Sequence, residues 1–286
     1  MTYRIGTRGS KLAMVQAGFV RDSLARAYPD DAFELVTIST KGDRVTDRSL
    51  ADLGGGAFVR EIERALLDGE IDLAVHSMKD LPAEQPEGLR LAKAWKREDA
   101  RDVLVMRERK AGDATDGLSA LDLLPQGATV ATGSVRRSAF LRQRRPDLNI
   151  VDIRGNVDTR LRKLFDPQPG EPVLDAIVLA AAGLIRLGRT EVITSYLDPS
   201  WMIPAPNQGQ LAIEVRDSRS HGPSPRGQED ERLLSKLNAL GDDAAEAVAQ
   251  AERNFLRATG ATCHEVVAAY ARFEDGVLKM ETHYEK

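Results

Sequence analysis

The sequence of 286 residues contains one cysteine and four histidines. A single cysteine cannot form an internal disulfide, and cysteine-poor chains are typical of the reducing cytoplasm. No two histidines have the spacing of a metal-ligand pair. We therefore expect a cytoplasmic protein without a metal centre. The histidines are His76, His221, His264 and His283.

Long apolar runs are also missing. No stretch approaches the ~20 apolar residues that span a bilayer, and Met1–Gly6 lacks the apolar core of a signal peptide. The formal net charge is −4, which disfavours binding to a nucleic acid. The composition, with 42% hydrophobic and 29% charged residues, is that of a globular protein. We expect no membrane partner and no nucleic-acid partner.

Positive charge is gathered in one part of this acidic sequence. Residues 130–163 carry eight arginines and one lysine against three aspartates. A local basic cluster in an acidic protein suits a small anionic ligand better than a polyanion. The cluster comprises Arg136, Arg137, Arg142, Arg144, Arg145, Arg154, Arg160, Arg162 and Lys163.

The first hundred residues alternate strand and helix patterns. Such alternation predicts βαβ units and a largely parallel sheet. Ser10 is placed to cap the first helix. The expected strands cover residues 4–6, 33–40 and 71–75, and the expected helices cover 10–27 and about 58–66.

The same alternation restarts after the polar residues 107–117. The apolar stretch 175–181 is typical of a strand buried on both faces. Residues 5–10 and 130–134 both run strand, small polar turn, helix, which directs helix N–H groups toward an anion. The expected strands cover 129–131, 149–153 and 175–181, and helices cover 134–145 and start at about 157.

The last third changes character after Pro204–Gly209. We expect a strand at 210–215, a polar linker at 217–228, and helices from about 230 and over 244–259. Two strands follow at 266–271 and 277–282, joined by Asp275-Gly276, a dipeptide typical of a hairpin turn. The layout is two α/β lobes and a small α+β appendage. The expected domains are 1–98 with 205–217, then 99–204, then 218–286.

One acidic residue stands at the end of an expected strand. The chain leaves the strand 71–75 in the polar turn His76–Pro82, which contains Asp80. Open α/β sheets bind ligands at the carboxyl ends of their strands, so Asp80 is a candidate catalytic acid. The alternative is a solvated surface carboxylate.

Arginines follow two further strands. Arg136 and Arg137 stand at one strand-to-helix junction, and Arg154 and Arg160 stand at the next. Guanidinium groups pair bidentately with carboxylates, so several at one edge would bind a polycarboxylate. We interpret three other arginines of the cluster, Arg142, Arg144 and Arg145, as a solvated helix face.

Cys263 lies between a long helix and a strand. A lone cysteine is usually a small buried apolar residue. Here the junction Gly260–Glu265 is polar, and an accessible thiolate is possible. A nucleophilic pair with His264 remains open.

An ordered set of segments resembles the porphobilinogen deaminase (hydroxymethylbilane synthase) family. The resemblance covers nearly the whole chain, and the order is more specific than any single motif. The segments are Thr7–Ala13, His76–Pro82, Thr132–Arg137, Arg154–Arg160, Ala180–Leu184, Pro204–Gly209, Ala251–Arg253 and Cys263.

This resemblance implies two periplasmic-binding-protein-like (type II) α/β lobes around a cleft, with the cysteine on a small α+β C-terminal domain. It implies a cytoplasmic, monomeric transferase of porphyrin and haem biosynthesis. Four molecules of porphobilinogen, each losing ammonia, add in turn to a dipyrromethane cofactor that the cysteine holds through a thioether. Hydrolysis then releases the linear tetrapyrrole hydroxymethylbilane.

The resemblance also assigns roles to residues. Asp80 would be the catalytic acid, and Cys263 would hold the cofactor covalently. The implied cofactor-binding residues are Lys79, Asp80, Thr132, Ser134, Arg136, Arg137, Arg154, Asn156 and Ala180. The implied substrate-binding residues are Arg8, Ser10, Arg154, Arg160 and Gln208.

The sequence departs from the family pattern in several places. The glycine loop 53–58 is short and lacks a lysine, and the chain stops early at Lys286. Two alternatives therefore remain: a cytoplasmic ligand-binding protein of the same two-lobed fold, and an inactive paralogue. The substituted positions are Ala261 and Thr262 for glycines, Val266 for a proline and Asp158 for a glycine.

Overall fold

The computed structural model describes residues 1–40, 59–108, 120–221, 224–262 and 265–286, which form two compact units. Unit 1 comprises Met1–Glu98, Gln210–Cys263 and Ala271–Met280, and unit 2 comprises Asp99–Gly209, His264–Tyr270 and Glu281–Lys286. Within the described residues, no helix is both long and apolar enough to cross a membrane.

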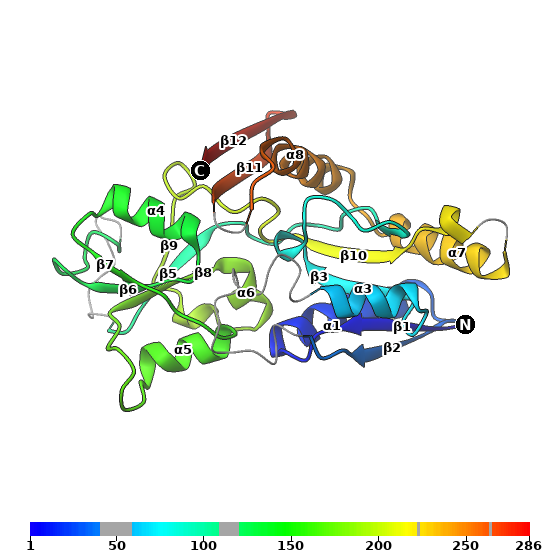
Figure 1. Cartoon of the computed structure of the whole chain (residues 1–286), viewed down its shortest axis with the longest axis horizontal. Helices are drawn as coiled ribbons and strands as arrows, with labels where there is room; N and C mark the ends of the chain where they lie inside the picture. Colours follow the sequence, from blue (N-terminus) through cyan, green and yellow to red (C-terminus); the bar gives the residue numbers. More distant parts are fainter. Residues whose placement is uncertain (41–58, 109–119, 222–223, 263–264) are drawn as a thin grey trace. The chain divides into compact units, whose positions relative to one another are not determined.

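Unit 1 contains a mixed sheet in the order β2-β1-β3-β10-β4. Figure 1 labels β1, β2, β3 and β10 of this sheet. β1 runs parallel to both β2 and β3, whereas β10 runs antiparallel to β3 and β4. The carboxyl ends of three adjacent strands therefore share one edge. The strands are β1 (Thr2–Thr7), β2 (Ala32–Thr37), β3 (Leu73–Ser77), β4 (Leu89–Leu91) and β10 (Leu211–Arg216).

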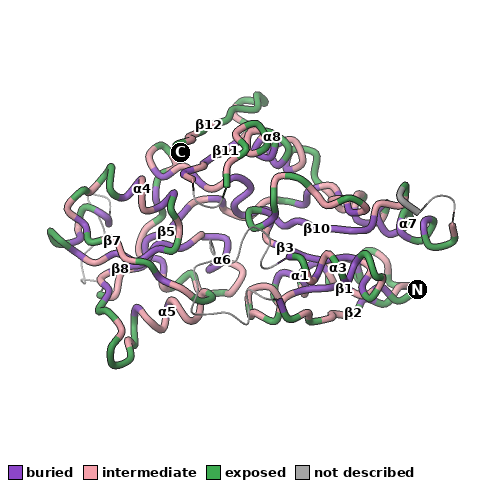
Figure 2. Tube along the Cα trace, viewed as in Figure 1, coloured by how far each residue is buried: buried purple, intermediate pink, exposed green. Residues whose placement is uncertain are grey.

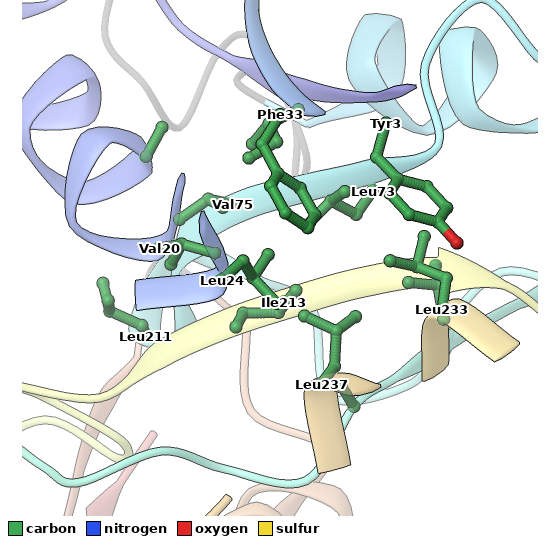
Figure 3. Packing of buried hydrophobic residues seen from close by; sticks show 14 of the residues in the cluster. Tyr3, Val20, Leu24, Phe33, Leu73, Val75, Leu211, Ile213, Leu233 and Leu237 are labelled. Carbon is green, nitrogen blue, oxygen red and sulfur yellow. The ribbon is translucent and has the colours of Figure 1, made fainter. Parts of the chain in front are cut away.

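Helices cover both faces of this sheet. α1 and α7 pack on alternate residues of β3 and β10, where Leu24 and Leu237 meet Leu73 and Ile213 (Figure 3). α3 packs on the other alternate residues, including Ala74. Alternation along a strand thus builds two cores from one sheet. The helices are α1 (Lys11–Ala27), α3 (Arg60–Leu67), α7 (Pro225–Ala239) and α8 (Asp243–Thr259).

Unit 2 contains a second sheet in the order β7-β6-β8-β5-β9. β6 runs parallel to β7 and β8, and β5 runs antiparallel to β8 and β9. The sheet of unit 1 has the same pattern, in which three parallel strands lie next to an antiparallel strand. The strands are β5 (Asp102–Met106), β6 (Thr129–Ala131), β7 (Asn149–Val151), β8 (Ala176–Ala180) and β9 (Ser195–Tyr196).

Helices also cover both faces of the second sheet. α4 packs through Phe140 and Leu141 on one face, and α5 and α6 pack through Leu161 and Leu184 on the other. β5 and β8 are buried along most of their length (Figure 2), as predicted for residues 175–181. The helices are α4 (Val135–Arg144), α5 (Val157–Phe165) and α6 (Ala181–Arg186).

The chain ends in the hairpin β11 (Val266–Glu274) and β12 (Val277–Glu285). Asp275 and Gly276 have φ angles of 51° and 78°. Positive φ at both central residues is the requirement of the tight hairpin turn that this dipeptide predicts. Three short 3-10 turns complete the described elements: η1 (Met78–Asp80), η2 (Thr190–Val192) and η3 (Ser218–His221).

The structure corrects several sequence-based boundaries. β3 covers Leu73–Ser77 instead of 71–75, so His76 and Ser77 belong to the strand and not to the turn, and β7 ends at Val151 instead of 153. α7 begins at Pro225 instead of about 230, so residues 225–228 are helix and not linker; Ser224 caps α7 and Pro225 occupies its first turn. The strand expected at 33–40 ends at Thr37. The division into three domains, with residues 218–286 as the third, stays a prediction.

Candidate active site

Polar residues of unit 1 lie at the carboxyl ends of β1 and β3. The two strands are parallel neighbours, with Ile5 opposite Leu73. Arg8 and Ser10 follow β1, while Lys79 and Asp80 follow β3. The sheet therefore brings these four predicted site residues to one edge, where ligands of open α/β sheets bind.

Asp80 ends the 3-10 turn η1, and this turn is fixed on both sides. Met78 and Leu81 are buried at 3% and 4% exposure, in one apolar cluster with Ala245 and Ala249 of α8. Lys79 and Asp80 between them are exposed. Two apolar anchors thus hold an exposed carboxylate in place, an arrangement that suits a group acting on a bound substrate.

Buried polar side chains form hydrogen bonds with the residues before and after this turn. Gln16 Nε2 donates to Ser77 Oγ at 3.0 Å. Arg253 Nη2 donates to the carbonyls of Pro82 and Ala83 at 3.0 and 2.6 Å. The segment 251–253, noted in the sequence for its resemblance alone, therefore supports the Asp80 turn from α8.

Unit 2 gathers its predicted site residues at one edge as well. Thr132 and Ser134 follow β6, Arg154 and Asn156 follow β7, and Ala180 is the last residue of β8. Because β6 is parallel to both neighbours, these strand ends lie side by side. The edge presents hydroxyl, amide and guanidinium donors.

Two of these residues are helix N-caps. Ser134 Oγ accepts from the Arg137 N–H at 3.4 Å, and Asn156 Oδ1 accepts from the Thr159 N–H at 2.9 Å. Ser10 does the same for α1 in unit 1, as predicted. Gly155, with φ of 107°, supplies a backbone conformation before α5 that side chains rarely adopt. The N-termini of α4 and α5 therefore both lie at the ligand edge.

Arg136 and Arg137 lie inside unit 2 and not on its surface. They are 5% and 6% exposed. Arg136 Nη2 lies 2.8 Å from Asp102 Oδ2, and Arg137 Nη2 lies 2.7 Å from Asp102 Oδ1. Burial is the largest influence on the pKa of Asp102 and raises it, but the two guanidinium groups outweigh burial and lower the pKa to about 2. Asp102 is therefore ionised at neutral pH.

Gln208 joins the same cluster. Its Nε2 donates to Asp102 Oδ1 and to the carbonyl of Ala100, both at 2.8 Å, and the residue is 1% exposed. The predicted contact between Gln208 and substrate stays a prediction.

Arg154 and Arg160 are more accessible than the buried pair. Arg154 Nε donates to Asp152 Oδ2 at 2.6 Å, and its side chain is 33% exposed. Arg160 Nε donates to the carbonyl of Gly155 at 2.8 Å. Both guanidinium groups thus lie near the polar turn that follows β7.

The solvated-face interpretation holds for two of three arginines. Arg142 and Arg144 are exposed on α4. Arg145 contradicts the interpretation: its side chain is 17% exposed, pairs with Asp147 at 2.7 Å and donates to the Leu121 carbonyl at 2.7 Å. Arg145 thus ties the end of α4 to the carbonyls of the preceding segment.

Two predicted features lie outside the described residues: Cys263 with His264, and the short glycine loop 53–58. Asp158, which replaces a glycine of the family pattern, stands in the first turn of α5. A carboxylate is favourable at a helix N-terminus, so the substitution fits the helix.

Asp102 is the residue that the sequence reasoning missed. An acid that follows a strand is the expected pattern at a ligand edge, whereas Asp102 is the first residue of β5. β5 is antiparallel to β8 and places Asp102 opposite Ala180, at the carboxyl edge. The signal in the sequence was an acid directly before the apolar run Val103–Val105.

Comparison with known proteins decides the family. A model described as "Porphobilinogen deaminase, dipyromethane cofactor binding domain" matches residues 3–222. A porphobilinogen deaminase of Lachnospira eligens is 54% identical over 98% of this chain and 88% of its own length. The chain belongs to the porphobilinogen deaminase family. This membership confirms the resemblance and, with it, the predicted transferase class and dipyrromethane cofactor.

Further relatives agree. The porphobilinogen deaminases of Clostridioides difficile and Deinococcus deserti are 45% and 46% identical over 94% and 98% of this chain, and over 82% and 84% of their own lengths. Among solved structures, an ancestral cationic amino acid solute binding protein matches 90% of this chain and 94% of its own, with 14% identity and a TM-score of 0.47. The mixed α/β class itself is confirmed by the two sheets and their helices.

Proposed function

We propose that this chain condenses four porphobilinogen molecules, with loss of ammonia, to hydroxymethylbilane, with Asp80 as the catalytic acid. The observation that carries the proposal is the set of donors at the adjacent ends of β6, β7 and β8, in a chain of this family. Each porphobilinogen brings an acetate and a propionate, and these donors suit such carboxylates.

The same donors fit the dipyrromethane cofactor, which consists of two linked pyrrole units. Its side chains are carboxylates, and the edge of unit 2 supplies hydroxyl, amide and guanidinium groups from separate strand ends. When bound, the cofactor supplies the starting pyrrole for the growing chain. The residues proposed to hold it are Thr132, Ser134, Arg136, Arg137, Arg154, Asn156 and Ala180 of unit 2, Lys79 and Asp80 of unit 1, and Cys263 through the thioether.

Asp80 acts on the aminomethyl group of the substrate. A proton must reach the nitrogen before it leaves as ammonia, and departure leaves a cation on the substrate. The carboxylate that remains after proton donation stabilises this cation. The exposed position of Asp80 on a fixed turn supports both roles.

The remaining proposed residues bind substrate carboxylates. Arg8 and Ser10 do so from the end of β1, Arg154 from the turn after β7, and Arg160 from the first turn of α5. Gln208 is proposed for the same task. Planar guanidinium groups bind a carboxylate with two parallel hydrogen bonds, which fixes its direction as well as its position.

The proposal also includes the setting in which the enzyme works. We place it in the cytoplasm as a monomer that binds no nucleic acid. The single cysteine supports the first point, and the net charge of −4 supports the last.

The direct test is incubation of the purified protein with porphobilinogen. We expect one ammonia released for each porphobilinogen consumed and four for each tetrapyrrole formed. Calorimetry with porphobilinogen measures binding separately from turnover. Binding without ammonia release would identify a ligand-binding protein or an inactive paralogue and would overturn the proposed activity.

Replacement of Arg154 by lysine should impair turnover strongly. Arg154→Lys keeps the charge but loses the planar fork, so it removes the paired hydrogen bonds to a substrate carboxylate. The matched control is Arg144→Lys on the exposed face of α4, where the side chain is 52% exposed. Steady-state assays compare the two variants. If both retain wild-type activity, Arg154 does not bind substrate.

A further inference from the structure

The buried carboxylate of Asp102 lies at the ligand edge of unit 2, although its strand runs in the opposite direction to the parallel strands. β5 pairs antiparallel with β8, and the Cα of Asp102 is opposite that of Ala180. The first residue of β5 therefore reaches the edge at which β8 ends. A residue within a central strand is also held more rigidly than one on a loop.

Asp102 is bonded to three of the proposed site residues at once. Oδ1 accepts from Arg137 Nε at 3.0 Å and Nη2 at 2.7 Å, and from Gln208 Nε2 at 2.8 Å. Oδ2 lies 2.8 Å from Arg136 Nη2. The Asp102 side chain has no exposure, so these groups meet away from solvent.

Backbone carbonyls fix the other ends of the two guanidinium groups. Arg136 Nη1 donates to the Ile203 carbonyl at 2.6 Å, and Arg137 Nη1 donates to the Val178 carbonyl at 3.0 Å. Each planar group is therefore held on two sides. Without the carboxylate, each guanidinium group would lose its charged partner and keep only neutral acceptors. These are the Ile203 carbonyl and Met202 Sδ for Arg136, and the Val178 carbonyl and Gln208 Oε1 for Arg137.

The charges of this cluster do not cancel. Among the described residues, Asp102 is the acid with which Arg136 and Arg137 form ion pairs, so two positive charges face one negative charge. A buried charge without a partner is costly. A surplus positive charge beside the donor edge therefore favours the approach of one further carboxylate.

We propose that Asp102 is a positioning residue that orients Arg136 and Arg137 and leaves them one net positive charge for a carboxylate of the pyrrole chain. The inference rests on the proposed function, because it takes the two arginines to be ligands of the cofactor. In this proposal, Asp102 acts only through the two arginines. A purely structural carboxylate would instead stabilise unit 2 without affecting attachment of the cofactor.

Asp102→Asn tests this difference against a matched control, Asp230→Asn. Asp230 also forms a buried ion pair with an arginine, 2.6 Å from Arg216 Nη2 at 3% exposure, but in unit 1 between α7 and β10. Both proteins are purified as folded species, and intact mass spectrometry measures the fraction that carries two extra pyrrole units. Thermal melting is recorded for both.

We expect Asp102→Asn to lower the cofactor-bearing fraction about tenfold or more. A displacement of a positioned binding group by about 1 Å is enough to cause a loss of this size. Asp230→Asn should melt at a lower temperature and keep the wild-type fraction. An equal loss in both variants, or none in Asp102→Asn, overturns the inference. A wild-type protein without the extra mass would instead overturn the proposed function.

A second variant decides the case in which Asp102→Asn yields no folded protein. Asp102→Glu keeps the charge and moves the carboxylate by about one bond length of 1.5 Å. We expect folded protein with a reduced cofactor-bearing fraction and a raised KM for porphobilinogen. Wild-type values of both in Asp102→Glu would show that the position of the carboxylate is unimportant, and the inference would fall.

Discussion

Asp80→Asn is expected to lower turnover roughly 10²-fold or more, the usual loss when a positioned acid–base group is removed. Asparagine matches aspartate in shape but neither delivers the proton to the leaving nitrogen nor carries the negative charge that stabilises the cation. The measurement is kcat from ammonia release, with intact mass recorded to follow bound intermediates.

The fold should tolerate this change. Asp80 is exposed, and the turn that carries it depends on the buried neighbours Met78 and Leu81. Glu84→Gln is the matched control, because Glu84 lies four residues further on and its side chain is 80% exposed. We expect the control to keep wild-type turnover. A folded Asp80→Asn protein with near wild-type kcat would remove Asp80 from the mechanism.

Local signals in the sequence predicted most of the edge of unit 2. Each signal is a short apolar strand, a capping residue and the start of a helical pattern, all close together in the sequence. The capping residues are Ser134 and Asn156, and the structure shows both caps. The turn of β12 with β11 is equally local. Such elements can be predicted because the residues that form them are neighbours in the chain.

Long-range pairing could not be predicted in the same way. Asp102 reaches the ligand edge only because β5 pairs antiparallel with β8, some seventy residues later in the chain. The burial of Arg136 and Arg137 follows from that pairing, because Asp102 supplies their countercharge. The burial of Arg145 has a related cause, since its carbonyl partners Leu121 and Leu124 precede it by 24 and 21 residues.

The two sheets explain why the sequence halves look alike. In each unit, one strand pairs in parallel with a neighbour on either side, and the next strand in the sheet order runs antiparallel. Ser10 and Ser134 then cap the helix that follows the central strand of the parallel trio. The same topology thus produces a helix N-terminus at the ligand edge of both units, and the side chains around it determine what each unit binds.

Cys263→Ser is expected to abolish the covalent cofactor, the largest effect of any single substitution considered. Serine lacks the thiolate that forms the thioether, so the denatured variant should show the mass of the unmodified chain. The wild type should show an excess equal to two pyrrole units, and peptide mapping should place it on Cys263. Thr262→Ser, one residue away, is the control and should keep the excess.

The physical case for a covalent anchor lies in the charge of the product chain. Every added pyrrole brings two more carboxylates, so the growing oligomer becomes steadily better solvated by water. Hydrogen bonds to arginines exchange with water between cycles, whereas a thioether does not, and retention through four additions requires a bond that survives each one. An unmodified mass from cells that supply porphobilinogen, with Cys263 freely alkylated, would contradict this role and would favour the ligand-binding protein or the inactive paralogue.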